Sequence, residues 1–334
     1  MRKVWIGLWL LLVVMGGCTA PQSDETAGDQ TGQKPHSAQV SQSETVPRLA
    51  SLHLPTGTKL RVVATTSLVA DVVGQIGGDV IDLRSLLPPN ADPHGYEVTP
   101  DDLRAISDAH LLFVNGLGLE ESVASILEEA RAKTVAVNVG VEVITEVEEE
   151  EEHPHAGGNP HTWWSIAAVE QWTHTIERSL STVDPAHAET YAANASDYRA
   201  ELTALDTELR ALVSQIPATE RKLATDHDTL AYFAQAFDFQ IVGLVVPSFS
   251  SLAEPSAQHL AQLQDQLRAE KVGALFVGST VNPRQAEQLA QDLGIRVVPI
   301  FTDSLSAADG PAATYVNFMR YNVNAIVGAL GGGK

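Results

Sequence analysis

The sequence predicts an α/β protein with two similar lobes, each built on a parallel four-stranded sheet, joined by one long backbone helix. The first observation is that short apolar, β-branched runs alternate with helical patterns in both halves of the chain. Such alternation is typical of parallel sheets covered by helices. The second observation is a single apolar stripe at helical spacing between the two halves. Four expected strands on either side of it indicate two lobes of the same kind.

The N-terminus is interpreted as a secretory signal over residues 1–17. Two basic residues precede an apolar run from Val4 to Val14, which is too short to span a bilayer as a mature helix. Cys18, the only cysteine, follows two glycines and resembles the acylated cysteine of a bacterial lipobox. An ordinary signal with a stray cysteine is the alternative. We therefore expect lipidation at Cys18 and an extracytoplasmic, membrane-anchored protein, at the cell surface or in the periplasm.

Residues 18–57 are expected to be the lipidated N-terminus and a disordered tether. They are rich in Ser, Thr, Gln, Gly and Pro and contain few large apolar residues, so they bury little apolar surface. His36 and His53 are interpreted as solvated residues of this linker.

The N-terminal lobe is expected over residues 58–183. Its strands are predicted near Leu60–Ala64, Val80–Leu83, Leu111–Val114 and Thr134–Asn138. Its helices are predicted near Leu68–Ile76, Asp101–Ser107, Glu120–Ala132 and, as an amphipathic stretch, Trp164–Leu180.

The linking helix is expected over residues 184–217, opened by Asp184-Pro185 and closed by Pro217. Its apolar positions are four and three residues apart in alternation: Tyr191, Ala195, Tyr198, Leu202, Leu205, Leu209, Leu212 and Ile216. The helix would be about 45 Å long, enough to run along both lobes. A coiled coil that dimerises is the alternative, but an isolated helix in an α/β chain is better explained by packing on its own lobes. We expect a monomer.

The C-terminal lobe is expected over residues 218–334. Its strands are predicted near Lys222–Thr225, Gln240–Val245, Ala274–Val277 and Arg296–Pro299. Its helices are predicted near Thr229–Phe237, Ser256–Glu270, Arg284–Leu293 and Pro311–Leu330.

Three histidines and an aspartate stand at comparable places in this arrangement: His94, His161, His227 and Asp303. His227 and Asp303 directly follow expected strands, and His94 follows one by a short loop. Ligands bind outside the carboxyl ends of parallel strands, so the four residues are expected to converge between the lobes. Three imidazoles and a carboxylate suit a borderline transition-metal ion such as Zn²⁺. The remaining histidines of the folded part, His110, His174, His187 and His259, are interpreted as structural or surface residues.

The chain is acidic, with a formal net charge of −21. It is therefore a poor candidate for binding nucleic acid or an anionic membrane surface, and it attracts cations. Part of the charge is the run Glu148–Glu152, which leads into His153 and His155. This loop is interpreted either as a weak secondary metal site or as a solvated charged loop.

The segments around the four residues resemble those of the metal-binding solute receptors of bacterial zinc/manganese ABC importers, the cluster A-I family. The matching segments are Asp92-Pro93-His94-Gly95-Tyr96, Asn159-Pro160-His161-Thr162-Trp163, Asp226-His227-Asp228-Thr229-Leu230 and Phe301-Thr302-Asp303-Ser304-Leu305. Two positions depart from the pattern, since aspartate is usual in place of Asn159 and many members are acidic at Gly278. The resemblance implies two α/β lobes joined by a long helix, metal binding by His94, His161, His227 and Asp303, and delivery of the ion to an ABC permease in the membrane.

Histidine at the third ligand position indicates zinc as the transported ion, because members with glutamate there tend to carry manganese. An additional imidazole also favours Zn²⁺ over the oxygen-preferring Mn²⁺. A manganese or iron receptor of the same family is the alternative, since receptors with three histidines and an aspartate have been linked to both zinc and manganese.

An enzyme is not expected. A catalytic zinc site keeps an open position for water, whereas three histidines and an aspartate can close a tetrahedron. The chain contains no HExxH motif, nucleophile elbow or Gly-rich phosphate loop. A zinc-dependent hydrolase and a surface adhesin are the alternatives from other classes.

Overall fold

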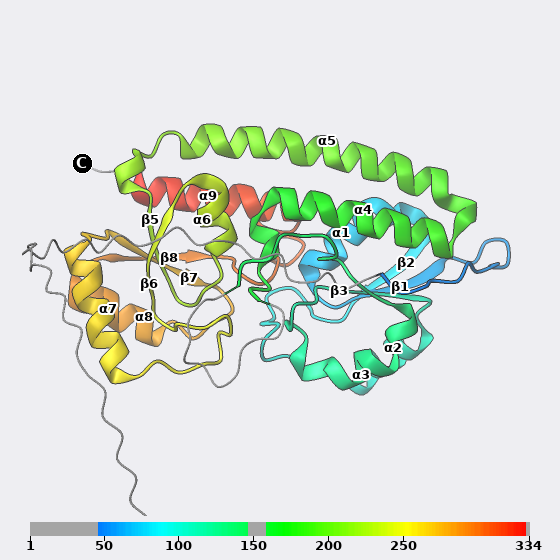
Figure 1. Ribbon diagram of the computed structural model, residues 1–334, viewed down its shortest axis with the longest axis horizontal. Helices are drawn as coiled ribbons and strands as arrows, with labels where there is room; N and C mark the ends of the chain where they lie inside the picture. Colours follow the sequence, from blue (N-terminus) through cyan, green and yellow to red (C-terminus); the bar gives the residue numbers. More distant parts are fainter. Residues whose placement is uncertain (1–45, 146–157, 332–334) are drawn as a thin grey trace, which may run out of the picture. The chain divides into compact units, whose positions relative to one another are not determined.

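The computed structural model describes residues 46–145 and 158–331, which belong to one compact unit of the chain. Two parallel four-stranded sheets form in these residues, each with its own helices, and one long helix runs along both lobes (Figure 1). The predicted α/β fold with two similar lobes and a joining helix is therefore confirmed.

The N-terminal lobe contains all four predicted strands. These are β1 (Leu60–Ala64), β2 (Ile81–Ser85), β3 (Leu111–Val114) and β4 (Thr134–Ala136), arranged in the order β2-β1-β3-β4. The helices are α1 (Ser67–Gly77), α2 (Pro100–Asp108), α3 (Ala124–Glu129) and α4 (Ile166–Val183). Strand β3 is buried at every position, as expected of an inner parallel strand with helices on both faces.

The C-terminal lobe repeats this topology. Its strands are β5 (Lys222–Thr225), β6 (Gln240–Leu244), β7 (Ala274–Gly278) and β8 (Arg296–Ile300), in the order β6-β5-β7-β8. Its helices are α6 (Ala231–Phe237), α7 (Ala257–Ala269), α8 (Arg284–Leu293) and α9 (Tyr315–Leu330). In both sheets the first strand of the half lies in the interior, next to the third.

Short polar side chains fix where several helices begin. The hydroxyl oxygens of Thr66, Thr99 and Ser165 accept a backbone N–H in the first turns of α1, α2 and α4. Asp102 also accepts the N–H of Thr99, which completes a capping box at α2. These caps satisfy N–H groups that have no partner within the helix.

The helix predicted over Glu120–Ala132 is interrupted, and only α3 is α-helical. The reason is that Glu120 is used for tertiary contacts. Its buried carboxylate accepts hydrogen bonds from the Thr65 hydroxyl (2.6 Å) and from the N–H groups of Asn115 (2.6 Å) and Gly116 (3.0 Å). The backbone after Glu120 therefore forms a 3₁₀ turn before α3 starts.

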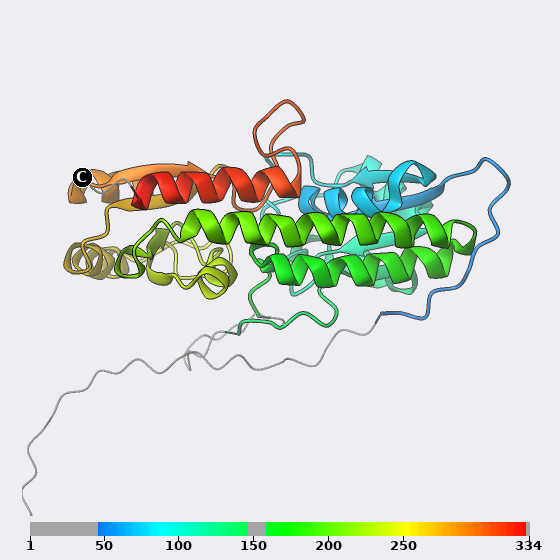
Figure 2. The ribbon, with the colours of Figure 1, turned by 90° about the horizontal axis from the view of Figure 1, so that it is seen from above.

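The long helix α5 (Ala188–Val213) carries the predicted apolar stripe toward the protein interior. It packs against α1 and α4 of the N-terminal lobe and against α9 of the C-terminal lobe, as Figure 2 shows from above. Tyr191, Leu202, Leu205 and Leu209 are all fully buried. At the C-terminal end Val213 is buried in place of Leu212, which is only partly covered. The stripe is thus explained by packing on the protein's own lobes.

One continuous apolar core connects the two lobes. Trp163 and Trp164, which precede α4, are fully buried within it. The Trp164 ring packs edge to face against Phe233 of α6, with ring centroids 5.9 Å apart. Its centroid also lies 5.0 Å from that of the Phe318 ring of α9. Because the lobes share a core and a helix, separating them exposes apolar surface.

The structure differs from the sequence analysis at the end of the expected tether. Val46, Leu49, Leu52 and Leu54 pack against the core, and the Leu52 N–H donates to the carbonyl of Val183 (2.8 Å). Composition averaged over residues 18–57 conceals these four apolar residues, which lie close together near its end. The packed part of the chain therefore begins before residue 58.

Several expectations fall outside the described residues. The signal segment, Cys18 and the acidic loop with His153 and His155 belong to residues 1–45 and 146–157. None of the helices within residues 46–145 and 158–331 combines the length and apolar character that a bilayer crossing requires.

Replacing Leu205 by alanine should destabilise the protein by about 2–5 kcal/mol, because a fully buried side chain leaves a cavity under α5. Thr203→Ala, an exposed change two residues away on the opposite side of the same helix, should stay within about 0.5 kcal/mol. Chemical denaturation of both variants measures the difference, and equal stability would mean that α5 does not anchor the core.

Candidate metal centre

The structure brings the four predicted residues together. One ligand atom from each of His94, His161, His227 and Asp303 lies within 4.8 Å of all the others. His161, His227 and Asp303 are fully buried, whereas His94 is half-buried. The convergence expected from the sequence is therefore present among the described residues.

Three of the side chains reach the centre from next to the end of a secondary-structure element, and the fourth comes from a loop. His227 and Asp303 follow β5 and β8 within three residues, and His94 lies in the loop between β2 and α2. His161 stands just before the 3₁₀ turn that leads into α4. Parallel strands place their carboxyl ends on one edge of a sheet, which explains why residues so distant in sequence meet.

Three of the six distances between the potential ligand atoms are close to those of a small tetrahedral site. His94 Nε2 and His161 Nε2 are 3.3 Å apart, and Asp303 Oδ1 lies 3.5 Å from His161 Nε2 and 3.6 Å from His227 Nε2. Four ligands at the usual zinc distance of about 2.1 Å are separated by about 3.4 Å at tetrahedral angles. The donor atoms thus stand at separations that one ion can bridge.

Two hydrogen bonds orient the buried imidazoles toward the centre. His161 Nδ1 lies 2.8 Å from Asn159 Oδ1, and His227 Nδ1 lies 2.9 Å from Asp226 Oδ1. Both oxygens are acceptors, because Asn159 Oδ1 and Asp226 Oδ1 also accept the backbone N–H of the histidine concerned. Each Nδ1 therefore carries the proton and each Nε2 presents its lone pair, as in metal-bound histidines.

Among the described residues, His227 Nε2 is a buried nitrogen without a hydrogen-bond partner. Leaving such an atom unpaired costs free energy, so its presence requires an explanation. A bound cation would satisfy it. The donor set and this nitrogen both fit a transition-metal ion.

The charges within the cluster oppose the effect of burial. Burial lowers the pKa of His161 well below its usual value. Burial also acts to lower the pKa of His227, but the negative charges of Asp303 and Asp226 outweigh it and raise this pKa well above its usual value. For Asp303, burial acts to raise the pKa, but the interactions with His227, His161 and His94 together outweigh it. The pKa of Asp303 is therefore below its usual value. The charges of His227 and Asp303 thus stabilise each other, and a bound cation would supply positive charge to Asp303 in the same way.

Asn159 and Asp226, which orient the histidines, are functional residues that the sequence pattern alone did not identify. Asp226, besides contacting His227, accepts the N–H of Gly278 (2.6 Å), and Asn159 donates from Nδ2 to the carbonyl of Asp228 (3.0 Å). Their positions in the sequence offered a signal, because Asn159 stands two residues before His161 and Asp226 stands one residue before His227. Only the folded structure shows which atoms they contact.

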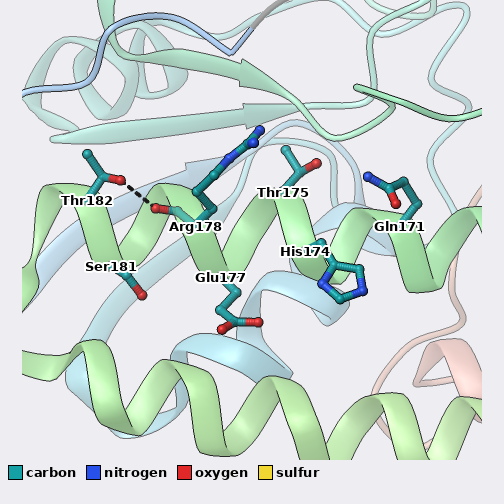
Figure 3. A pocket seen from close by; sticks show the side chains of 7 residues that line it. All are labelled: Gln171, His174, Thr175, Glu177, Arg178, Ser181 and Thr182. Atoms are coloured by element: carbon teal, nitrogen blue, oxygen red, sulfur yellow. Dashed lines mark hydrogen bonds between the residues drawn. The ribbon is translucent and has the colours of Figure 1, made fainter.

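Three of the other described histidines make ordinary structural contacts, which agrees with their interpretation as structural or surface residues. His110 Nδ1 accepts the N–H of Arg61 (3.0 Å), His187 pairs with Asp184 (2.7 Å) and His259 Nε2 bonds the carbonyl of Leu244 (2.8 Å). His174 lies on the outer side of α4, in an open hollow of about 530 Å³ (Figure 3). That hollow is lined by seven residues of this single helix and by none of the four clustered residues.

Comparisons with known proteins agree with this arrangement. Residues 62–329 match the family described as zinc-uptake complex component A, periplasmic. The chain is 32% identical over 283 residues to the manganese ABC transporter substrate-binding lipoprotein PsaA of Streptococcus mitis, covering 82% of this chain and 90% of PsaA. It is 31% identical over 279 residues to the iron-binding protein YfeA of Yersinia pestis, covering 83% and 88%.

A solved structure has the same fold. The S38A mutant of the Mn-bound periplasmic metal-binding protein from Candidatus Liberibacter asiaticus superposes with a TM-score of 0.73 at 28% identity. The superposition covers 82% of this chain and all of the Liberibacter protein chain. Taken with the fold and the four converging residues, these matches show that the chain belongs to the family of zinc-uptake component A, the substrate-binding proteins of bacterial metal-ion ABC importers.

Proposed function

We propose that this protein is an extracytoplasmic receptor that binds one Zn²⁺ ion at His94, His161, His227 and Asp303 and delivers it to an ABC permease. The observation that carries the proposal is the cluster itself, in which the buried His227 Nε2 has no hydrogen-bond partner and lies 3.6 Å from Asp303 Oδ1. Asn159 and Asp226 support it, because they hold the imidazoles in the tautomer that a cation requires.

Zinc is proposed because of the donor set. Three imidazole nitrogens and one carboxylate suit a borderline ion in tetrahedral geometry, and four protein ligands complete that geometry. A closed site of this kind leaves no position for a water nucleophile, so we propose transport and no catalysis. The transport proteins among the relatives favour the same reading over an adhesin.

Manganese is the second candidate for the transported ion, and iron is a further alternative. The similar proteins are named for manganese (PsaA) and iron (YfeA), and the similar solved structure contains manganese. The chemistry opposes this, because Mn²⁺ binds nitrogen sites more weakly than Zn²⁺ and prefers more oxygen ligands.

Attachment to the membrane is proposed to depend on a lipid at Cys18, with the chain acting as a monomer. The relatives named as lipoproteins support this proposal, as does the position of Cys18 after an apolar N-terminal run.

Replacing His227 or His94 by alanine should abolish tight binding of one zinc ion per chain. The loss should exceed the roughly ten- to hundredfold decrease that follows removal of a ligand's hydrogen-bond partner. Titration of metal-free protein against a chromophoric chelator measures it. His259→Ala, whose ring contacts only a backbone carbonyl at 2.8 Å, is the matched control. Unchanged affinity in both ligand variants would refute the site.

Direct competition should show tighter binding of Zn²⁺ than of Mn²⁺, because the site offers three nitrogens and one carboxylate. The measurement is metal content after equilibration of the apoprotein with both ions at equal free concentrations. Preferential retention of manganese would favour the second candidate. Metal uptake by cells that lack the protein then identifies the transported ion.

Cys18→Ser should prevent acylation, because the hydroxyl replaces the thiol that carries the lipid. The protein should be released in soluble form or remain as an uncleaved precursor. Intact mass measurement of the membrane and soluble fractions distinguishes these products from the lipidated one. A mature, lipid-free N-terminus at another residue in the unmodified protein would contradict the proposal.

A further inference from the structure

The two carboxylate oxygens of Asp303 have different surroundings. Oδ1 faces the centre, 3.5 Å from His161 Nε2 and 3.6 Å from His227 Nε2. Oδ2 instead accepts a hydrogen bond from the Thr302 hydroxyl at 2.5 Å and a longer one from the Thr280 hydroxyl at 3.4 Å. Oδ1 thus faces the imidazoles and has one long hydroxyl contact, from Thr229 (3.4 Å), whereas Oδ2 accepts both a short and a long hydroxyl hydrogen bond.

The Thr302 hydroxyl occupies a space that the neighbouring strand leaves open. Thr302 is fully buried just after β8, and Gly278 ends the adjacent strand β7. A Cβ atom at Gly278 would lie 2.3 Å from Thr302 Oγ1 and 3.1 Å from Asp226 Oδ2. The lack of a side chain at Gly278 is therefore what allows the hydroxyl to stand where it does.

We propose that Thr302 and Thr280 make Asp303 a one-oxygen ligand and so determine the metal selectivity of the site, an inference that rests on the proposed function. Hydrogen bonds from two hydroxyls stabilise the negative charge on Oδ2 and oppose its turning toward an ion. The ion then has three nitrogens and one oxygen, which is the tetrahedral number that zinc prefers. Mn²⁺ prefers six ligands with more oxygen, and it loses the second carboxylate oxygen that would otherwise be within reach.

The alternative is that the ion binds both oxygens and breaks the hydroxyl contacts. In that case Thr302 contributes to packing only, and removing its hydroxyl changes neither the coordination number nor the preference between the two ions. The coordination number therefore separates a selectivity role from a structural one.

The experiment compares the unmodified protein with Thr302→Val and Thr302→Ser. Valine has nearly the shape of threonine without the hydroxyl, and serine keeps the hydroxyl. X-ray absorption of the zinc-loaded proteins gives the number of ligands, and visible spectra of the cobalt-loaded proteins distinguish four- from five-coordinate ions. Competition with a chelator gives the Zn²⁺ and Mn²⁺ affinities of each variant. Thr280→Val, at a partly exposed position, provides the same readout should Thr302→Val not fold.

The unmodified protein and Thr302→Ser should hold a four-coordinate ion. Thr302→Val should show a higher coordination number, and its preference for Zn²⁺ over Mn²⁺ should fall about ten- to hundredfold, the range seen when a ligand loses its hydrogen-bond partner. Five ligands in the unmodified protein, or an unchanged preference in Thr302→Val, would overturn the inference and leave the receptor function standing. Failure of the unmodified protein to bind either ion tightly would instead overturn the proposed function, and this inference with it.

Discussion

Burying three imidazoles and a carboxylate away from water is the constraint on which the rest of this structure depends. Each of these groups loses hydration when buried and is stable only if the fold supplies partners. The partners come from both lobes, since Asn159 holds His161 while Asp226 and Thr302 hold His227 and Asp303. The ligand geometry is therefore maintained only while the two lobes keep one relative placement.

The segment before α4 is the main connection that fixes this placement. Trp163 Nε1 donates to the carbonyl of Thr302 (2.8 Å), and the carbonyl of Trp163 accepts from the Tyr315 hydroxyl (2.8 Å). The carbonyl of Asn159 accepts from the Tyr232 hydroxyl at 2.8 Å. These buried bonds join the residues flanking His161 to the lobe that carries His227 and Asp303. Helix α5 adds a rigid element along both lobes, so the site is held by the core beneath it and by the segment beside it.

The sequence predicts the strands, the long helix and the ligand cluster because each leaves a local signal. Apolar runs and a regular stripe depend on residues close in sequence, and the ends of parallel strands are places where ligands gather. The interrupted helix at Glu120 and the packing of Val46 to Leu54 could not be predicted in this way, because both result from contacts with distant residues. The roles of Thr302, Thr280 and Gly278 also depend on two neighbouring strand ends, which no periodicity describes.

The unequal burial of the four ligands has a kinetic consequence. His161, His227 and Asp303 are closed off from water, whereas His94 is half-buried and sits on a loop tied to the other lobe by the bond from the Ser251 hydroxyl to Asp92 (2.7 Å). If the four residues hold an ion as proposed, His94 is the side chain through which the site meets solvent. Exchange of that ion would then depend most on this one loop, whereas affinity would depend on all four side chains. On the proposed function, displacing this single segment would open the site to solvent and leave the three buried side chains in place.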